Sequence, residues 1–119
     1  YGPDADPPGD TLRAFRAGRQ VDPLDDPGGA DLTADVDFGR LRRLAEARGL
    51  AVFGPAPQGE FLLRLGAAAR TERLAAAQPA RARDLEAALA RLVAPQEMGQ
   101  RFKAICLASA GAAAPPGFA

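Results

Sequence analysis

A helix signal that runs directly into a strand signal, over residues 37–53, constrains the fold of this chain most. Asp37 can accept a hydrogen bond from an unpaired N–H at a helix start, and Gly49 can end the helix in a left-handed conformation. Between them, apolar and charged residues separate onto two faces at helical spacing. Residues 50–53 then form an apolar run that Gly54-Pro55 closes. The sequence therefore predicts a helix over 38–48, followed by a short buried strand.

Glycine and proline divide the rest of the chain into short elements. Residues 1–10 and 23–29 are rich in turn-forming residues, and residues 11–21 are interpreted as a short extended segment. Several short helices are expected after residue 54, and residues 101–108 are expected to form the last strand. This order predicts an α/β fold, with helices on the faces of a sheet and a helical insertion before its last strand.

Three helices are expected within that insertion. The first contains Phe61-Leu62 and breaks near Gly66, the second covers 68–77, and the third starts at Pro79. Apolar residues recur along the third helix at helical spacing: Leu85, Ala88, Leu89, Leu92 and Val93. We interpret them as core rather than partner surface. The tail from 111 to 119 is expected to be frayed or laid on the surface.

Length and composition allow one domain with a modest core. The chain has 119 residues, and its hydrophobic content of 47% is largely alanine, which buries little area per residue. Aromatic residues make up 6% and tryptophan is absent. We therefore expect marginal stability if the chain stands alone.

Charge is balanced over the whole chain but not along it. Residues 1–37 hold nine aspartates and three arginines, a net of −6, whereas residues 38–119 hold twelve basic and six acidic residues, a net of +6. The acidic segment could attract a basic substrate. Alternatively, these aspartates are turn and cap residues, which the sequence alone favours. Zero net charge and scattered arginines argue against nucleic-acid binding.

Several kinds of chemistry are excluded by the residues present. The chain has no histidine, and its single cysteine, Cys106, allows no internal disulfide and is interpreted as a small buried hydrophobe. A zinc site is excluded on the same grounds. Asp4, Asp6 and Asp10 have a spacing faintly like that of a calcium loop, but no bidentate glutamate follows. We expect no metal site, no signal peptide before Tyr1 and no membrane span.

A series of motifs follows the chain in a particular order. The motifs are Tyr1-Gly2, Gly-Asp-Thr-Leu-Arg at 9–13, Asp-Pro-Leu at 22–24, the acidic run at 31–38, Gly54-Pro55, Gln58-Gly59, Phe61-Leu62, Gly66, Arg70, Met98-Gly99 and Phe102-Lys103. In this order the chain resembles the C-terminal half of the MidA family. These proteins are S-adenosylmethionine-dependent class I methyltransferases related to mitochondrial complex I assembly factors.

The resemblance implies a domain organisation. Residues 1–37 would be a loop-rich segment after the central strand, 38–53 a helix–strand unit, 54–100 a helical substrate lobe, and 101–119 the final strand and tail. Together they would form the C-terminal portion of a Rossmann-like methyltransferase sheet. The half that binds S-adenosylmethionine should lie upstream of Tyr1. No cofactor-binding residue is expected in this chain, since neither glycine cluster follows a first strand.

The implied activity is methyl transfer to arginine of a partner protein. A guanidinium must be held by carboxylates, so Asp31, Asp35 and Asp37 are candidates for gripping the substrate. Asp35 has the weakest local alternative, whereas Asp37 is better explained as a helix cap and Asp31 could close a turn. By resemblance alone, Arg13 and Gln58 are hydrogen-bonding candidates, and both could instead be brackets that hold loops together.

Partners and location complete the expectations. The protein substrate could be a subunit of a respiratory complex. The isolated chain should be inactive, and it should be either self-associated or paired with its missing half. The alanine-, arginine- and glycine-rich composition is typical of a GC-rich bacterium, which favours a cytoplasmic location; a eukaryotic chain would be mitochondrial. The alternative function is a non-catalytic helical module that binds a protein through residues 54–100.

Overall fold

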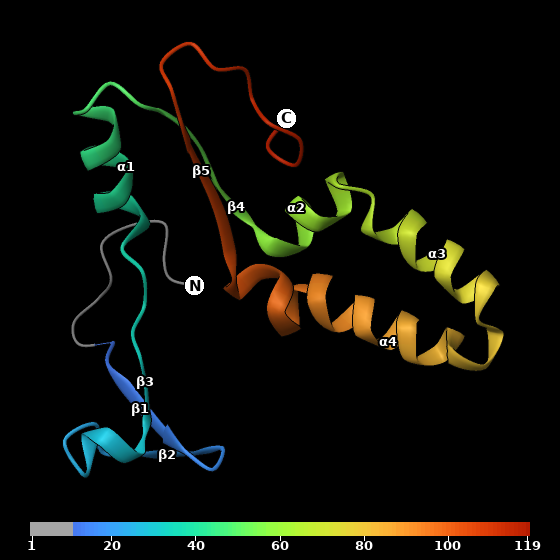
Figure 1. Cartoon of the computed structure of the whole chain (residues 1–119), viewed down its shortest axis with the longest axis horizontal. Coiled ribbons are helices and arrows are strands. Elements are labelled where there is room, and N and C mark those ends of the chain that lie inside the picture. Colours follow the sequence, from blue (N-terminus) through green and yellow to red (C-terminus); the bar gives the residue numbers. More distant parts are fainter. Residues whose placement is uncertain (1–10) are drawn as a thin grey trace. The chain divides into compact units, whose positions relative to one another are not determined.

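The computed structural model describes residues 11–119 and divides the chain into two compact units, residues 1–41 and 42–119 (Figure 1). The loop expected at residues 1–10, the first motif of the family series and the rejected calcium-like spacing lie outside the described residues. Arg13, Asp31 and Asp35 belong to the first unit, and Gln58 belongs to the second.

The described part of the first unit is built on a three-stranded antiparallel sheet. Its strands, in the spatial order β2-β1-β3, are β1 (Arg13–Arg16), β2 (Arg19–Val21) and β3 (Asp31–Thr33). Ala17 and Gly18 join β1 to β2 with φ angles of 51° and 75°. The single extended segment expected over 11–21 is therefore wrong. Two consecutive residues with positive φ make a tight hairpin turn, and alanine in that position conceals it in the sequence.

The segment between β2 and β3 is a turn, as predicted. The Asp25 N–H donates to the Asp22 carbonyl at 3.1 Å, and a short 3₁₀ helix, η1 (Pro27–Gly29), follows. Strand β3 then pairs antiparallel with β1, with Leu32 opposite Ala14. The sequence predicts a loop-rich segment here. Residues 31–33 become a strand only because they pair with residues 13–15 of β1.

Helix α1 (Phe38–Glu46) begins where the sequence predicts and ends two residues earlier than expected. The carboxylate of Asp37 accepts a hydrogen bond from the Arg40 N–H at 2.6 Å, which confirms the N-cap. Gly49 has a φ of 74°, as a left-handed stop requires. The boundary between the two units falls inside this helix, after Leu41.

The second unit contains a separate two-stranded antiparallel sheet. Strand β4 (Ala51–Pro57) pairs with β5 (Lys103–Ala108), with an irregularity between Phe53 and Ala56. β4 runs through Gly54-Pro55 instead of ending there, and its residues 51–53 are half-buried rather than buried. Residues 11–21 do not pair with this sheet, so the described residues form two sheets and not the one expected.

Five helical elements lie between β4 and β5. They are α2 (Gln58–Arg64), α3 (Ala67–Ala77), η2 (Pro79–Arg81), α4 (Ala82–Val93) and the wider-wound η3 (Pro95–Gly99). The break at Gly66, with a φ of 84°, and the helical start at Pro79 are confirmed. α3 and α4 pack against each other as a helical hairpin (Figure 1). None of the helices in the described residues is long and apolar enough to cross a membrane.

Few side chains are buried among residues 11–119. The buried apolar residues are Ala14, Phe38, Ala45 and Ala56. No residue of α3 or α4 is buried, and Leu92 of the expected core stripe is 39% exposed. Cys106 is half-buried on β5. The tail is laid on the surface, with the Phe118 ring 5.1 Å from the Phe61 ring.

Candidate functional site

The first unit places two of the candidate residues on one face of its sheet. Strand register sets Arg13 opposite Thr33 and Phe15 opposite Asp31. Because side chains alternate along a strand, these four side chains share a face. Arg13 and Asp31 are both exposed, and an Arg13 guanidinium nitrogen donates to the Leu12 carbonyl at 3.0 Å.

Asp35 lies two residues beyond β3 and is half-buried. Its backbone N–H donates to the hydroxyl of Thr11 at 3.1 Å, across 24 residues of sequence. This bond fixes the main chain where it leaves the sheet. The carboxylate of Asp37, two residues further, is occupied at the start of α1. The structure therefore supports the cap interpretation of Asp37. The backbone of Asp35 is anchored by its hydrogen bond to Thr11.

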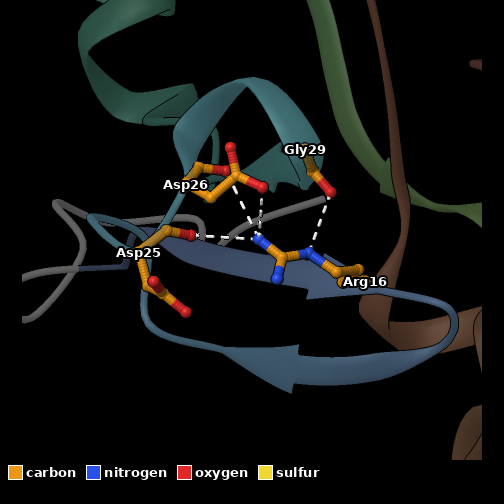
Figure 2. Close-up of polar contacts among 4 residues, drawn as sticks. All are labelled: Arg16, Asp25, Asp26 and Gly29. Atoms are coloured by element: carbon orange, nitrogen blue, oxygen red, sulfur yellow. Dashed lines mark hydrogen bonds and ion pairs between the residues drawn. The ribbon is translucent and has the colours of Figure 1, made fainter.

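Arg16 holds the acidic loop of the first unit in place (Figure 2). Its Nε donates to the Gly29 carbonyl at 3.0 Å, and its Nη2 donates to the Asp25 carbonyl at 3.2 Å. The same Nη2 lies 3.1 Å from a carboxylate oxygen of Asp26. One guanidinium thus joins β1 to three residues of the turn before β3. We call Arg16, Asp25, Asp26 and Gly29 the arginine bracket.

The arginine bracket depends on the conformation of the turn that contains Asp26 and Gly29. Asp26 has a left-handed φ of 54°, and a methyl group on Gly29 would overlap its carboxylate. The two charged side chains are 40% and 65% exposed, so their ion pair contributes no more than about 1 kcal/mol. The directional hydrogen bonds from the Arg16 guanidinium to the Gly29 and Asp25 carbonyls set the shape of the loop. The sequence indicates a turn at 25–29 but does not mark Arg16, on another strand, as the residue that closes it.

Gln58 lies in the second unit, where the backbone passes from β4 into α2. Its N–H donates to the Phe102 carbonyl at 2.8 Å. Its side-chain amide donates to the Leu92 carbonyl at 2.9 Å, near the C-terminal end of α4. Carbonyls in the last turn of a helix lack intrahelical partners, and Gln58 satisfies one of them. This geometry favours the bracket interpretation of Gln58.

Two glycines meet the end of α4 beside Gln58. A methyl group on Gly59 would overlap the carbonyl oxygen of Val93, and so would a methyl group on Gly99. Both glycines are buried. We call Gly59, Gly99 and Val93 the glycine junction. It lets α2, α4 and η3 approach each other at backbone distance.

The described residues do not offer the glycine-rich turn that holds a nucleotide-like cofactor. Gly28 and Gly29 lie in η1, Gly54 lies within β4, and Gly59 is used for helix packing. Within residues 11–119, no three aspartate, glutamate, histidine or cysteine side chains are grouped as metal ligands.

Comparison with known proteins identifies the class to which this arrangement belongs. Residues 1–56 match the family model described as "Putative S-adenosyl-L-methionine-dependent methyltransferase". The chain also aligns with a protein from Burkholderia thailandensis described as a "likely methyl transferase" and bound to S-adenosyl-homocysteine. That alignment has a TM-score of 0.77 and 26% identity, and it covers 90% of this chain and 28% of the other. Over residues 1–56 the chain matches this methyltransferase family, and its α/β fold class is confirmed.

Particular relatives are closer in sequence. The chain is 45% identical over 100 residues to the protein arginine methyltransferase NDUFAF7 homolog, mitochondrial, of Drosophila melanogaster. It is 39% identical over 100 residues to the human protein arginine methyltransferase NDUFAF7, mitochondrial. These alignments cover 82% of this chain but only 23% and 22% of the relatives. The chain thus spans less than a quarter of the length of the curated relatives it matches.

Proposed function

We propose that this chain forms the substrate side of an S-adenosylmethionine-dependent methyltransferase that modifies arginine in a partner protein. The observation that carries the proposal is the similarity to named arginine methyltransferases, which extends over 82% of the chain. Among the described residues, Gly18, Gly49 and Gly66 lie at turns with positive φ, and Gly59 and Gly99 pack against Val93. We therefore propose that the cofactor is bound mainly by residues outside this chain.

The chemistry asks little covalent help from the protein. S-adenosylmethionine supplies a methyl group that is already activated, so catalysis rests on alignment and on exclusion of water. The guanidinium nitrogen must be oriented toward that methyl group and must finally lose a proton. Carboxylates orient a guanidinium through paired, charge-assisted hydrogen bonds. An acidic substrate side suits this task.

We assign roles to the four candidates on that basis. Asp35 and Asp31 would hold the substrate guanidinium: Asp35 has a fixed backbone, and Asp31 has an exposed side chain on the sheet. Gln58 would act as a bracket, because its side chain bonds the Leu92 carbonyl across 34 residues, and Arg13 would support the sheet surface opposite Thr33. Their contribution would be to hold the substrate side in shape.

Partner and location follow from the same proposal. The substrate would be a protein, and the family resemblance suggests a subunit of a respiratory complex. The relatives named above are mitochondrial proteins. The abundance of alanine, arginine, glycine and proline supports the cytoplasm of a GC-rich bacterium for this chain, with the mitochondrion as the eukaryotic equivalent.

Assays of methyl transfer and of cofactor binding test the proposal in a longer chain, the extended version, which includes residues upstream of Tyr1. S-adenosyl-homocysteine should bind the extended version and not the 119-residue chain, which should be inactive. Asp35→Ala should lower kcat/KM for an arginine substrate by about 10- to 100-fold, as loss of a charge-assisted bond predicts. Asp25→Ala is the matched control, because its carboxylate is exposed and its carbonyl, not its side chain, meets Arg16.

Failure of both versions to bind S-adenosyl-homocysteine would contradict the enzyme proposal. If residues 54–100 alone then still bound a partner protein, the helical-module alternative would replace it. An Asp35→Ala effect no larger than that of Asp25→Ala would reject the assigned role of Asp35.

The exposed apolar surface leads to a proposal about assembly. Among the described residues of the second unit, several leucine side chains are at least 38% exposed, and they are spread over helices, residues that follow them, and β5. They are Leu44, Leu50, Leu63, Leu65, Leu92 and Leu107. β5 contains no proline, whereas Pro55 and Pro57 leave β4 without two N–H donors. We propose that further strands pair along β5, with β4 at the sheet edge.

The isolated chain should accordingly self-associate, because an unpaired strand edge and exposed leucines both favour association. Sedimentation of the 119-residue chain should give species larger than a monomer at micromolar concentration. The version extended upstream should sediment with less association. A sharply monomeric, cooperatively folded isolated chain would refute this proposal.

A further inference from the structure

After β5 the chain turns back and packs against α2 and β4 of the same unit. Gly111, with a φ of 78°, lies in a turn in which the Ala112 N–H donates to the Ser109 carbonyl at 3.1 Å. Residues 109–114 are all exposed. A second turn follows, in which the Phe118 N–H donates to the Pro115 carbonyl at 3.1 Å. The tail thus consists of an exposed tether and a folded tip (Figure 1).

The folded tip contacts α2 and β4 at the same time. The Phe118 ring lies 5.1 Å from the Phe61 ring at an interplanar angle of 52°, a tilted aromatic pair. The same ring covers Gly54 of β4, where a methyl group would lie 2.9 Å from Phe118 Cε1. One aromatic side chain therefore bridges the strand and the helix that follows it.

Gly117 seats the backbone of the tip directly on α2. It is buried, and a methyl group there would lie 2.5 Å from the Phe61 ring and 3.3 Å from Leu65. An Arg64 guanidinium nitrogen reaches the Gly117 carbonyl at 3.5 Å, and the same side chain pairs with Glu60 at 3.1 Å. The attachment of the tail is thus concentrated in two residues, Gly117 and Phe118.

The helix that receives the tip also holds α4. Gln58, the first residue of α2, donates its side-chain amide to the Leu92 carbonyl, and Gly59 packs on Val93. α2 is a helix of seven residues, and isolated helices of this length are unstable in water. Its position must therefore be maintained by its neighbours, of which the tip is one.

We propose that residues 115–118 form a latch, an intramolecular ligand of the apolar seat made by Gly54, Phe61 and Leu65. The latch holds α2 in the position from which Gln58 reaches α4, and its release loosens α2 first. Its relevance to substrate binding rests on the proposed function, in which Gln58 shapes the substrate side. The docking of residues 115–118 on α2 does not depend on the proposed function.

Amide hydrogen exchange in the full chain tests the latch without any methyl transfer. Gly117→Ala should speed exchange in α2 by about tenfold, the upper range for losing an aromatic contact of this kind. Gly111→Ala is the matched control: its φ is also positive, but nothing lies within 4 Å of the added methyl group. It should leave α2 unchanged, and α3 serves as internal reference in both variants.

Phe118→Ala provides a second variant that keeps the backbone unstrained, and it should also speed exchange in α2. If exchange in α3 shows that Gly117→Ala has unfolded the unit, Phe118→Ala decides. Unchanged α2 exchange in Phe118→Ala, or equal effects of Gly117→Ala and Gly111→Ala, would overturn the latch. Either result leaves the methyltransferase proposal untouched, because that proposal is judged by cofactor binding and turnover.

Discussion

The two units are held together by different means. In the described part of the first unit, a three-stranded sheet is joined to its loop by the guanidinium of Arg16, whose bonds lie at the surface. In the second unit, Gly59 and Gly99 bring backbones into direct contact around Val93. Polar bonds at a surface can be exchanged for bonds to water or to a ligand, whereas backbone contact leaves no room for rearrangement. The loop of the first unit is thus held by exchangeable polar bonds, and the helices of the second unit by direct backbone packing.

The largest effect should come from filling the glycine junction. Gly99→Ala forces a methyl group against the Val93 carbonyl, and overpacking against an unyielding backbone should lower the free energy of unfolding by about 3 kcal/mol. Gly28→Ala is the control, since nothing lies within 4 Å of its added methyl group. Chemical denaturation of both variants measures the difference. A Gly99→Ala variant as stable as Gly28→Ala would show that α4 can shift, which would remove the contrast.

A smaller effect is expected from the arginine bracket. Arg16→Lys keeps the charge but loses the planar fork that reaches Gly29 and Asp25 together, so it should cost about 1 kcal/mol. The loss should appear as faster amide exchange at residues 25–29, with α4 unaffected. Arg19→Lys, an exposed arginine across the hairpin, is the matched control. Equal exchange in the two variants would mean that the loop holds its shape without Arg16.

The smallest effect concerns α1, the helix that contains the sequence boundary between the two units. Asp37→Ala removes the cap on the Arg40 N–H and should reduce stability by about 0.5–1 kcal/mol, whereas Asp37→Asn should retain most of it. Thermal unfolding followed by circular dichroism measures both variants. If Asp37→Ala instead abolished methyl transfer in the extended version while leaving stability unchanged, Asp37 would be a substrate ligand and not merely a cap.

Helix ends were the most predictable part of this fold. Asp37, Gly49, Gly66 and Pro79 act through the backbone within one turn of their own position, so a single sequence contains the required information. The family resemblance was also readable, because its motifs follow the whole chain in order. Strand β3 was not predictable, since residues 31–33 become a strand only by pairing with β1.

The candidate site divides in the same way. The cap at Asp37 is a local interaction and was predicted, whereas Arg16 acts across nine to thirteen residues and was missed. Gly59 and Gly99 entered the sequence analysis only as members of family motifs, because their reason for being glycine is a carbonyl on another helix. The substrate roles of Asp31 and Asp35 stay predictions, since they depend on a ligand that must approach them.

The glycine junction limits which amino-acid substitutions this chain can accept during evolution. The atom that obstructs a side chain at positions 59 and 99 is a main-chain oxygen, which every amino acid carries. No replacement of Val93 can therefore make room, and a suppressor of Gly99→Ala would have to displace or shorten α4 itself. Both glycines should consequently resist substitution jointly, whatever residue occupies position 93.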